Sequence, residues 1–145
     1  MTYLETPQGF FLRLSIGEPL HDTLVQFCAE RGITAGHFTA IGAVRSLKLA
    51  YYHLDRKEYA TRAFPGDLEV VSCTGNIALL EGRPFLHVHG LFSDAEYRPY
   101  AGHVVRAEVS ATLEVFLTPF PGGGIRRAFD EATGLKLCVF EPRVA

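Results

Sequence analysis

The chain has 145 residues, of which 48% are hydrophobic and 21% charged, and its formal net charge is -2. This length and balance predict one globular domain over residues 1–145, able to bury a core without disulfide staples. The charge excludes the broad basic surface of a non-specific nucleic-acid binder, and no apolar run approaches the ~20 residues of a membrane helix.

The cysteines, Cys28, Cys73 and Cys138, are far apart in the sequence, and any pairing leaves one thiol over. A disulfide framework is therefore not expected, and the N-terminus shows no signal-peptide pattern. Buried, reduced thiols fit a reducing compartment, so we expect a cytoplasmic protein with no membrane partner.

The first predicted elements are a strand and a helix. Gly9 to Ile16 is rich in Phe and Leu and alternates as a strand does. The helix begins at Pro19 and ends before Gly32, two residues that suit those positions. Its apolar residues recur at helical spacing and should lie on a sheet: Leu20, Leu24, Phe27 and Cys28.

Short strands with tight turns follow. The predicted strands are Thr34–Ile41, Arg45–Leu54, Lys57–Phe64, Leu68–Leu80 and Pro84–Phe92. Short connections favour antiparallel pairing. The predicted class is therefore α+β: a central, mostly antiparallel sheet with one main helix packed on it, in two layers or a sandwich.

The segment His103 to Leu117 alternates without a break, with His103 in phase with the apolar face. As one straight strand it would run roughly 50 Å, longer than the roughly 40 Å diameter of a globule of this size. Either a bulge bends it, or its end lies against a partner subunit. Beyond it we expect a loop at Pro121–Gly124, a short helix at Ile125–Ala132 and a closing strand at Leu135–Phe140.

The candidate site is a cluster of histidines. His87 and His89 are two apart on a strand and should share one face, and His103 should point inward at the start of the next strand. Three neutral imidazoles can hold zinc or a similar divalent transition metal with one position open. The alternative is a set of hydrogen-bonded structural histidines.

The turn between these strands contains Asp94, Glu96 and Tyr97, which either orient an imidazole or are solvated turn residues. His21, His37 and His53 show no ligand spacing and are expected in structural or surface roles.

Several segments resemble the plant and prokaryote conserved (PPC) domain, also called domain of unknown function 296. The matching segments are Gly66–Ser72, Gly75–Ala78, Phe85–Gly90, Gly102–Val104, Ala107–Val115 and Phe129–Leu135. The resemblance covers nearly the whole chain. It implies the sheet-and-helix fold just described, assembly as a homotrimer, and a zinc-type metal on His87, His89 and His103.

Plant members of this family join the domain to an AT-hook, whose core is Arg-Gly-Arg-Pro. This chain instead has Glu81-Gly82-Arg83-Pro84, which reads as a turn and argues against direct DNA binding. The family transfers no established catalytic activity, so we assign no catalytic residue.

Three functions follow as expectations. The first is a small metal-binding homotrimer of unknown molecular role and unknown small-molecule ligand. The second is a DNA-associated or regulatory protein that uses the domain for assembly. The third is a hydrolase-type enzyme with a three-histidine zinc site and Glu96 or Glu108 as base.

Overall fold

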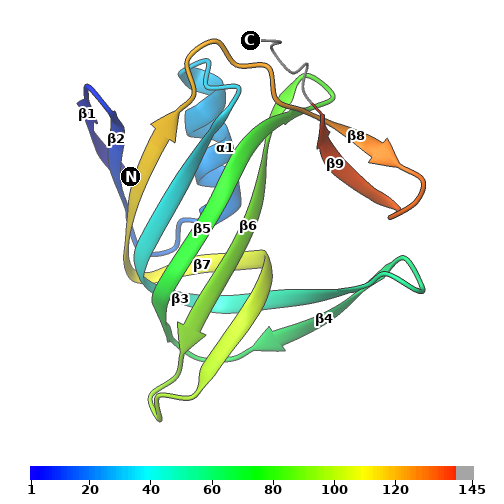
Figure 1. The fold of residues 1–145 in the computed structure, drawn as a ribbon. Helices are drawn as coiled ribbons and strands as arrows, with labels where there is room; N and C mark the ends of the chain where they lie inside the picture. The colour runs from blue at the N-terminus through cyan, green and yellow to red at the C-terminus, as the bar shows by residue number, and fades with distance from the viewer. Residues whose placement is uncertain (140–145) are drawn as a thin grey trace.

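The computed structural model describes residues 1–139. In that part of the chain nine strands form one mixed, mostly antiparallel sheet, and one helix packs on it (Figure 1). The predicted class is confirmed in these terms: a mostly β chain with a single helix. The elements are β1 (Thr2–Thr6), β2 (Gly9–Leu14), α1 (Leu20–Glu30), β3 (Gly36–His53), β4 (Glu58–Phe64), β5 (Leu68–Leu80), β6 (Arg83–Ser93), β7 (Pro99–Pro119), β8 (Arg126–Asp130) and β9 (Leu135–Val139).

Four strands form a closed circuit of pairings. β3 pairs with β5, β5 with β6, β6 with β7, and β7 returns to β3, each time antiparallel. The β1–β2 hairpin extends the sheet beyond β7, and β4 pairs with β3. The β8–β9 hairpin joins β5 through one parallel pair, Leu79 with Arg126. The circuit brings β6 and the start of β7 together, which matters for the histidines.

Helix α1 lies where the sequence predicts it. Pro19 is its N-cap residue, and Gly32 follows its end with a φ of 64°. The positive φ is a conformation that glycine adopts without strain, which explains why the helix stops there. The predicted apolar face is confirmed, because Leu20, Leu24, Phe27 and Cys28 are all buried. No helix in residues 1–139 has the length and apolar content to cross a membrane.

One apolar cluster fills the space between α1 and the inner face of the curved sheet. Every buried side chain of the described residues is hydrophobic. The largest of these side chains are Phe27, Phe38, Phe92, Leu12, Leu14, Leu20, Leu24, Leu47, Ile77, Leu113 and Leu117. The opposite sheet face is therefore available for polar side chains.

Strand β7 bends rather than overhanging the molecule (Figure 1). Its pairing with β3 shifts register between Gly42 and Val44 and twice more between Arg45 and Leu49. Such irregularities bend a strand and increase its twist. The expected bulge is therefore present, and the length of this segment carries no argument for a partner subunit.

Some predicted boundaries are wrong. β3 is one strand where two were expected, because its pairing continues through the irregularities near Gly42. β1 was not predicted; it is short and largely exposed, and its register with β2 holds it in place. The predicted closing strand corresponds to β9, and its last residue, Phe140, lies outside the described residues.

The segment predicted as a helix at Ile125–Ala132 instead contains strand β8. A hairpin turn explains the difference. The Asp130 carboxylate accepts hydrogen bonds from the Thr133 backbone N–H at 2.8 Å and hydroxyl at 2.7 Å. This turn holds β8 against β9, so pairing overrides the local helical preference.

The Glu81-Gly82-Arg83-Pro84 segment is a turn, as expected. Leu80 pairs with Arg83, and the two residues between them have φ values of 53° and 79°. Two positive φ values are typical of the type I′ turn of a tight hairpin.

Candidate metal centre

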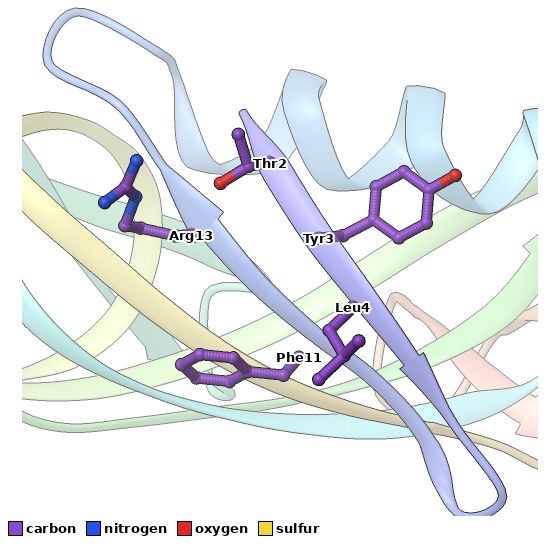
Figure 2. Close-up of a pocket in the computed structure, with 5 residues that line it drawn as sticks. All are labelled: Thr2, Tyr3, Leu4, Phe11 and Arg13. Atoms are coloured by element: carbon purple, nitrogen blue, oxygen red, sulfur yellow. The ribbon is translucent and has the colours of Figure 1, made fainter.

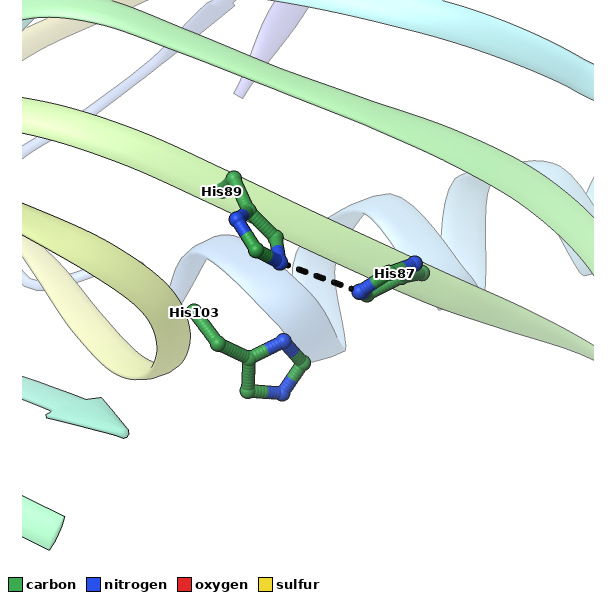
Figure 3. A group of neighbouring side chains, drawn as sticks. All are labelled: His87, His89 and His103. Carbon is green, nitrogen blue, oxygen red and sulfur yellow. Dashed lines mark hydrogen bonds between the residues drawn. The ribbon is translucent and has the colours of Figure 1, made fainter. Parts of the chain in front are cut away.

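His87 and His89 project from one face of β6, as predicted. Leu86 and Val88, which alternate with them, are buried at 3% and 0% exposure. His87 is partly buried and His89 exposed. Both imidazoles therefore lie on the sheet face away from the core, and Figure 3 shows the two rings close together with a dashed line between their Nε2 atoms.

His103 joins them from β7. It is the direct partner of His89 in the antiparallel ladder, so the two side chains share a face. The prediction that His103 is in phase with the apolar core face is wrong. Val104 is 1% exposed and Val105 42%, so the core-facing phase here is that of Val104.

The bulges in β7 explain the error. The next core residue after Val104 is Ala107, three positions on, because the register against β3 shifts between these residues. A one-residue slip moves a strand's side chains to the other face. The alternation of apolar residues in the sequence gives no sign of this slip. His103 therefore lies beside His87 and His89 as predicted, but on the outer face of the sheet.

The three imidazoles converge closely enough to share one ion. Each offers a nitrogen, and these three atoms all lie within 4.8 Å of one another. The Nε2 atoms of His87 and His89 are 3.1 Å apart. Nitrogens of a tetrahedral zinc complex with bonds of about 2.0–2.1 Å lie roughly 3.3 Å apart. The donor set and spacing therefore fit a zinc-type ion.

The surroundings of His87 and His103 favour the neutral form of these two rings. Desolvation lowers the pKa of His103 to about 4, and the neighbouring histidines and Arg127 act in the same direction. Desolvation also lowers the pKa of His87, again with help from Arg127 and His89. The neutral ring is the form that ligates metal. In addition, the buried Nδ1 of His103 has no hydrogen-bond partner in residues 1–139.

Three further residues border the cluster. The Tyr59 ring stacks on His103, with centroids 5.4 Å apart and planes 29° apart. Asn76 lies opposite His87 in the β5–β6 ladder, and its Oδ1 accepts a hydrogen bond from Arg127 at 2.7 Å. Sequence reasoning gave none of these three a role at the site. Arg127 had no usable signal, because its segment was expected to be a helix.

The side chains of Asp94, Glu96 and Tyr97, in the turn between β6 and β7, do not orient the imidazoles. The Asp94 carboxylate accepts hydrogen bonds from the Tyr100 hydroxyl at 2.6 Å and the Arg98 side chain at 2.7 Å, and these hold its pKa well below the usual range. Glu96 pairs with Arg98 at 2.9 Å, and Tyr97 is 87% exposed. Of the two expected alternatives, the solvated structural turn agrees with these contacts.

The other histidines of the described chain lie outside the cluster. His37 packs against Phe120, with ring centroids 5.6 Å apart, and His53 against Tyr51 at 5.0 Å. His21 lies on α1, and its Nδ1 is buried without a hydrogen-bond partner in residues 1–139.

A hollow elsewhere on the surface shares no residue with the cluster. It measures about 360 Å³ and lies over the β1–β2 hairpin, lined by Thr2, Tyr3, Leu4, Phe11 and Arg13 (Figure 2). Its lining offers one cation and no ligating carboxylate or imidazole. This hollow therefore offers no second set of metal ligands.

A closed four-strand circuit, one helix and three clustered histidines on the outer face define a mostly β protein with a possible three-histidine metal site. The comparisons identify its family. The Plants and Prokaryotes Conserved (PCC) domain matches residues 1–121, and the chain belongs to that family. The predicted resemblance is thus confirmed. No curated protein matches the chain.

Solved structures share the whole fold. A metal-containing protein from Archaeoglobus fulgidus has a TM-score of 0.85 at 41% identity, covering 96% of this chain and 99% of its own. A plant- and prokaryote-conserved protein from Pyrococcus horikoshii has a TM-score of 0.83 at 30% identity, with coverage of 93% and 92%. A Bacteroides thetaiotaomicron protein, provisionally described as DNA binding, has a TM-score of 0.92 at 26% identity, with coverage of 97% and 98%.

Proposed function

We propose that this PCC-domain protein binds one divalent transition metal, zinc or a similar ion, on His87, His89 and His103. The observation that carries the proposal is the convergence of three imidazole nitrogens within 4.8 Å on neighbouring strands. Support also comes from the Archaeoglobus fulgidus relative, which is described as metal-containing. The ligand set is all nitrogen, which suits zinc and its neighbours better than calcium or magnesium.

The residues of the chain supply a prepared site. β6 sets His87 and His89 on one face, and the ladder to β7 sets His103 opposite His89. Desolvation keeps His87 and His103 in the neutral form, so little proton release is needed at neutral pH. A metal on three protein ligands supplies a Lewis-acid centre with an open coordination position.

Elemental analysis of the purified full chain tests the proposal. We expect one metal per chain in the wild type, and its loss in His87→Ala, in His89→Ala and in His103→Ala. The matched control is His37→Ala, which removes an exposed histidine outside the cluster and should keep the metal. Circular dichroism checks that each variant is folded. Metal retained in all three cluster variants would refute the assignment.

We further propose that the protein is a homotrimer. Besides the family resemblance, exposed apolar side chains on the outer sheet face support self-association, since such patches mark interaction surfaces. Ile41, Val71 and Phe116 are 52%, 52% and 54% exposed on the central strands β3, β5 and β7. Light scattering coupled to gel filtration should give three times the chain mass of 16.0 kDa. A monomer mass at all concentrations would contradict this.

The hydrolase alternative is not favoured, because both carboxylates expected as bases pair with arginines. Glu108 pairs with Arg45 at 2.8 Å, and Glu96 pairs with Arg98 at 2.9 Å. Neither belongs to the histidine cluster. We therefore assign the metal to ligand binding or to structure. Separately, the free cysteines suit a reducing compartment, and we propose the cytoplasm.

The DNA-associated alternative is favoured by one observation, the provisional description of the Bacteroides thetaiotaomicron relative. The net charge of -2 opposes it. A mobility-shift assay with A·T-rich duplex at low salt separates the two readings. A shift that weakens with added salt would support DNA binding, and no shift would dismiss it.

A further inference from the structure

Arg127 brings a positively charged side chain to the histidine cluster. It lies on β8, and its guanidinium is fixed from two sides, donating to Asn76 Oδ1 at 2.7 Å and to the Lys136 carbonyl at 2.9 Å. It also lies over the Phe85 ring, 5.3 Å from the centroid. Asn76 is the ladder partner of His87, and Phe85 precedes His87 by two positions on β6. The guanidinium therefore lies on the cluster face, immediately beside His87.

The guanidinium keeps unused hydrogen-bonding capacity. Arginine has five N–H donors, and the two bonds just described use two of them. The buried Nε has no hydrogen-bond partner in residues 1–139. A buried donor without a partner is costly to leave unpaired, so an acceptor that enters beside the guanidinium would relieve this cost.

Arg127 forms no ion pair with a carboxylate in residues 1–139. The acidic residues of the adjacent turn are bound to Arg98, and Glu108 is bound to Arg45. A divalent ion on three neutral imidazoles would keep its full double charge, and Arg127 adds a third positive charge. Such a site would attract an anion.

We propose that the metal site binds a small oxyanion, the carboxylate or phosphate group of a small molecule, between the open metal position and Arg127. The inference rests on the proposed metal site and names the ligand class for it. Arg127 matches the shape of carboxylate and phosphate oxygens, since its planar fork donates two parallel hydrogen bonds. Tyr59 and Phe85, 45% and 37% exposed, give the site apolar flanks that accept a small organic body.

Cobalt loading of the full chain provides the test, because the visible spectrum of Co²⁺ reports its coordination. Acetate and inorganic phosphate are titrated separately into the cobalt protein at constant ionic strength. We expect a saturable spectral change with at least one of them, and the tighter of the two identifies the oxyanion. Arg127→Gln should weaken that anion roughly 10- to 100-fold, in line with the loss of a charge-assisted hydrogen-bonded partner.

Two variants make the comparison specific. Arg126→Gln removes a neighbouring, exposed charge on the same strand and should keep the wild-type anion affinity. Arg127→Lys keeps the charge but loses the fork, and should bind the anion with intermediate affinity. It also serves if Arg127→Gln does not fold. One cobalt per chain in each variant shows that the metal ligands are intact.

The outcomes separate this inference from the metal proposal. If cobalt binds but neither anion alters its spectrum, the oxyanion site is refuted and the metal site stands. Equal anion affinity in the wild type and in folded Arg127→Gln and Arg127→Lys also refutes it. If the wild type takes up no cobalt or zinc, the metal proposal itself fails.

Discussion

His89 and His103 are direct partners across the β6–β7 ladder, with ring centroids 5.5 Å apart. Backbone pairing, rather than flexible loops, therefore holds two of the three candidate ligands. His87 follows from the two-residue period of β6. A site built on paired strands is more rigid than a site built on loops, and little reorganisation should accompany ion binding.

Zinc should stabilise the folded protein. An ion that binds only the native state adds about 2.7 kcal/mol at a free concentration of 100 times its Kd. We expect the thermal midpoint of the chelator-treated chain to rise with added zinc and to stop rising in His89→Ala. His37→Ala should respond like the wild type. A midpoint rise of the same size in His89→Ala would show that zinc acts elsewhere.

The metal-free protein should lose stability in mild acid. Burial lowers the folded-state pKa of His103 from about 6.5 to about 4, so the unfolded chain binds the extra proton in this window. Stability is then fully present above the upper value and falls as the pH drops toward the lower one. Urea titrations across the window should show a shallower pH slope for His103→Gln than for the wild type. An unchanged slope in a folded His103→Gln would contradict the burial argument.

Two glycines beside the histidines, Gly90 and Gly102, differ in how tightly they are packed. A Cβ on Gly90, next to His89, would lie 2.6 Å from the Phe92 ring, which is a buried core residue. Its ladder partner Gly102 has more room, with the nearest atom, the Ala50 carbonyl oxygen, at 3.2 Å. We expect Gly90→Ala to destabilise by about 1–3 kcal/mol through overpacking, and Gly102→Ala by less. Urea unfolding measures both, and equal losses would contradict the packing model.

The sequence predicts the helix and most strands because their cues are local. The spacing of Leu20, Leu24 and Phe27 follows the helical period, and tight turns such as Glu81-Gly82 mark strand ends. The pairing of His87 with His89 on one face likewise needs only the period of a strand. The family resemblance extends to the candidate metal ligands because its motifs contain all three histidines.

The rest depends on long-range pairing that local cues do not carry. The side of the sheet on which His103 lies is decided by bulges against β3, and the sequence alternation continues through them unchanged. β8 is a strand because β9 and the Asp130 turn hold it in place. Arg127 reaches Asn76 only through that hairpin, so its place beside the cluster follows from tertiary structure alone.

The thiols should differ sharply in reactivity. Cys28 and Cys73 are buried, and burial raises the pKa of each thiol to about 12. Cys138 is exposed. Because the thiolate is the reactive form, a thiol reagent should modify one cysteine per native chain and three after denaturation. The variant Cys138→Ser should abolish the native reaction, and fast labelling that persists in this variant would contradict the assignment.

The β8–β9 hairpin that carries Arg127 is docked onto the β3–β4 arm, and Tyr52 supplies a specific contact. Its hydroxyl donates to the Thr133 carbonyl at 2.6 Å, and the Lys57 ammonium donates to the nearby Glu131 carbonyl. Tyr52→Phe should cost about 1 kcal/mol, the usual net value of one such hydrogen bond. Hydrogen exchange should speed up mainly in β8 and β9, because docking is lost while the core is untouched. The control is Tyr51→Phe, at a neighbouring ring that is 69% exposed, and it should leave exchange unchanged. Equal exchange in both variants would show that the hairpin holds its position without Tyr52.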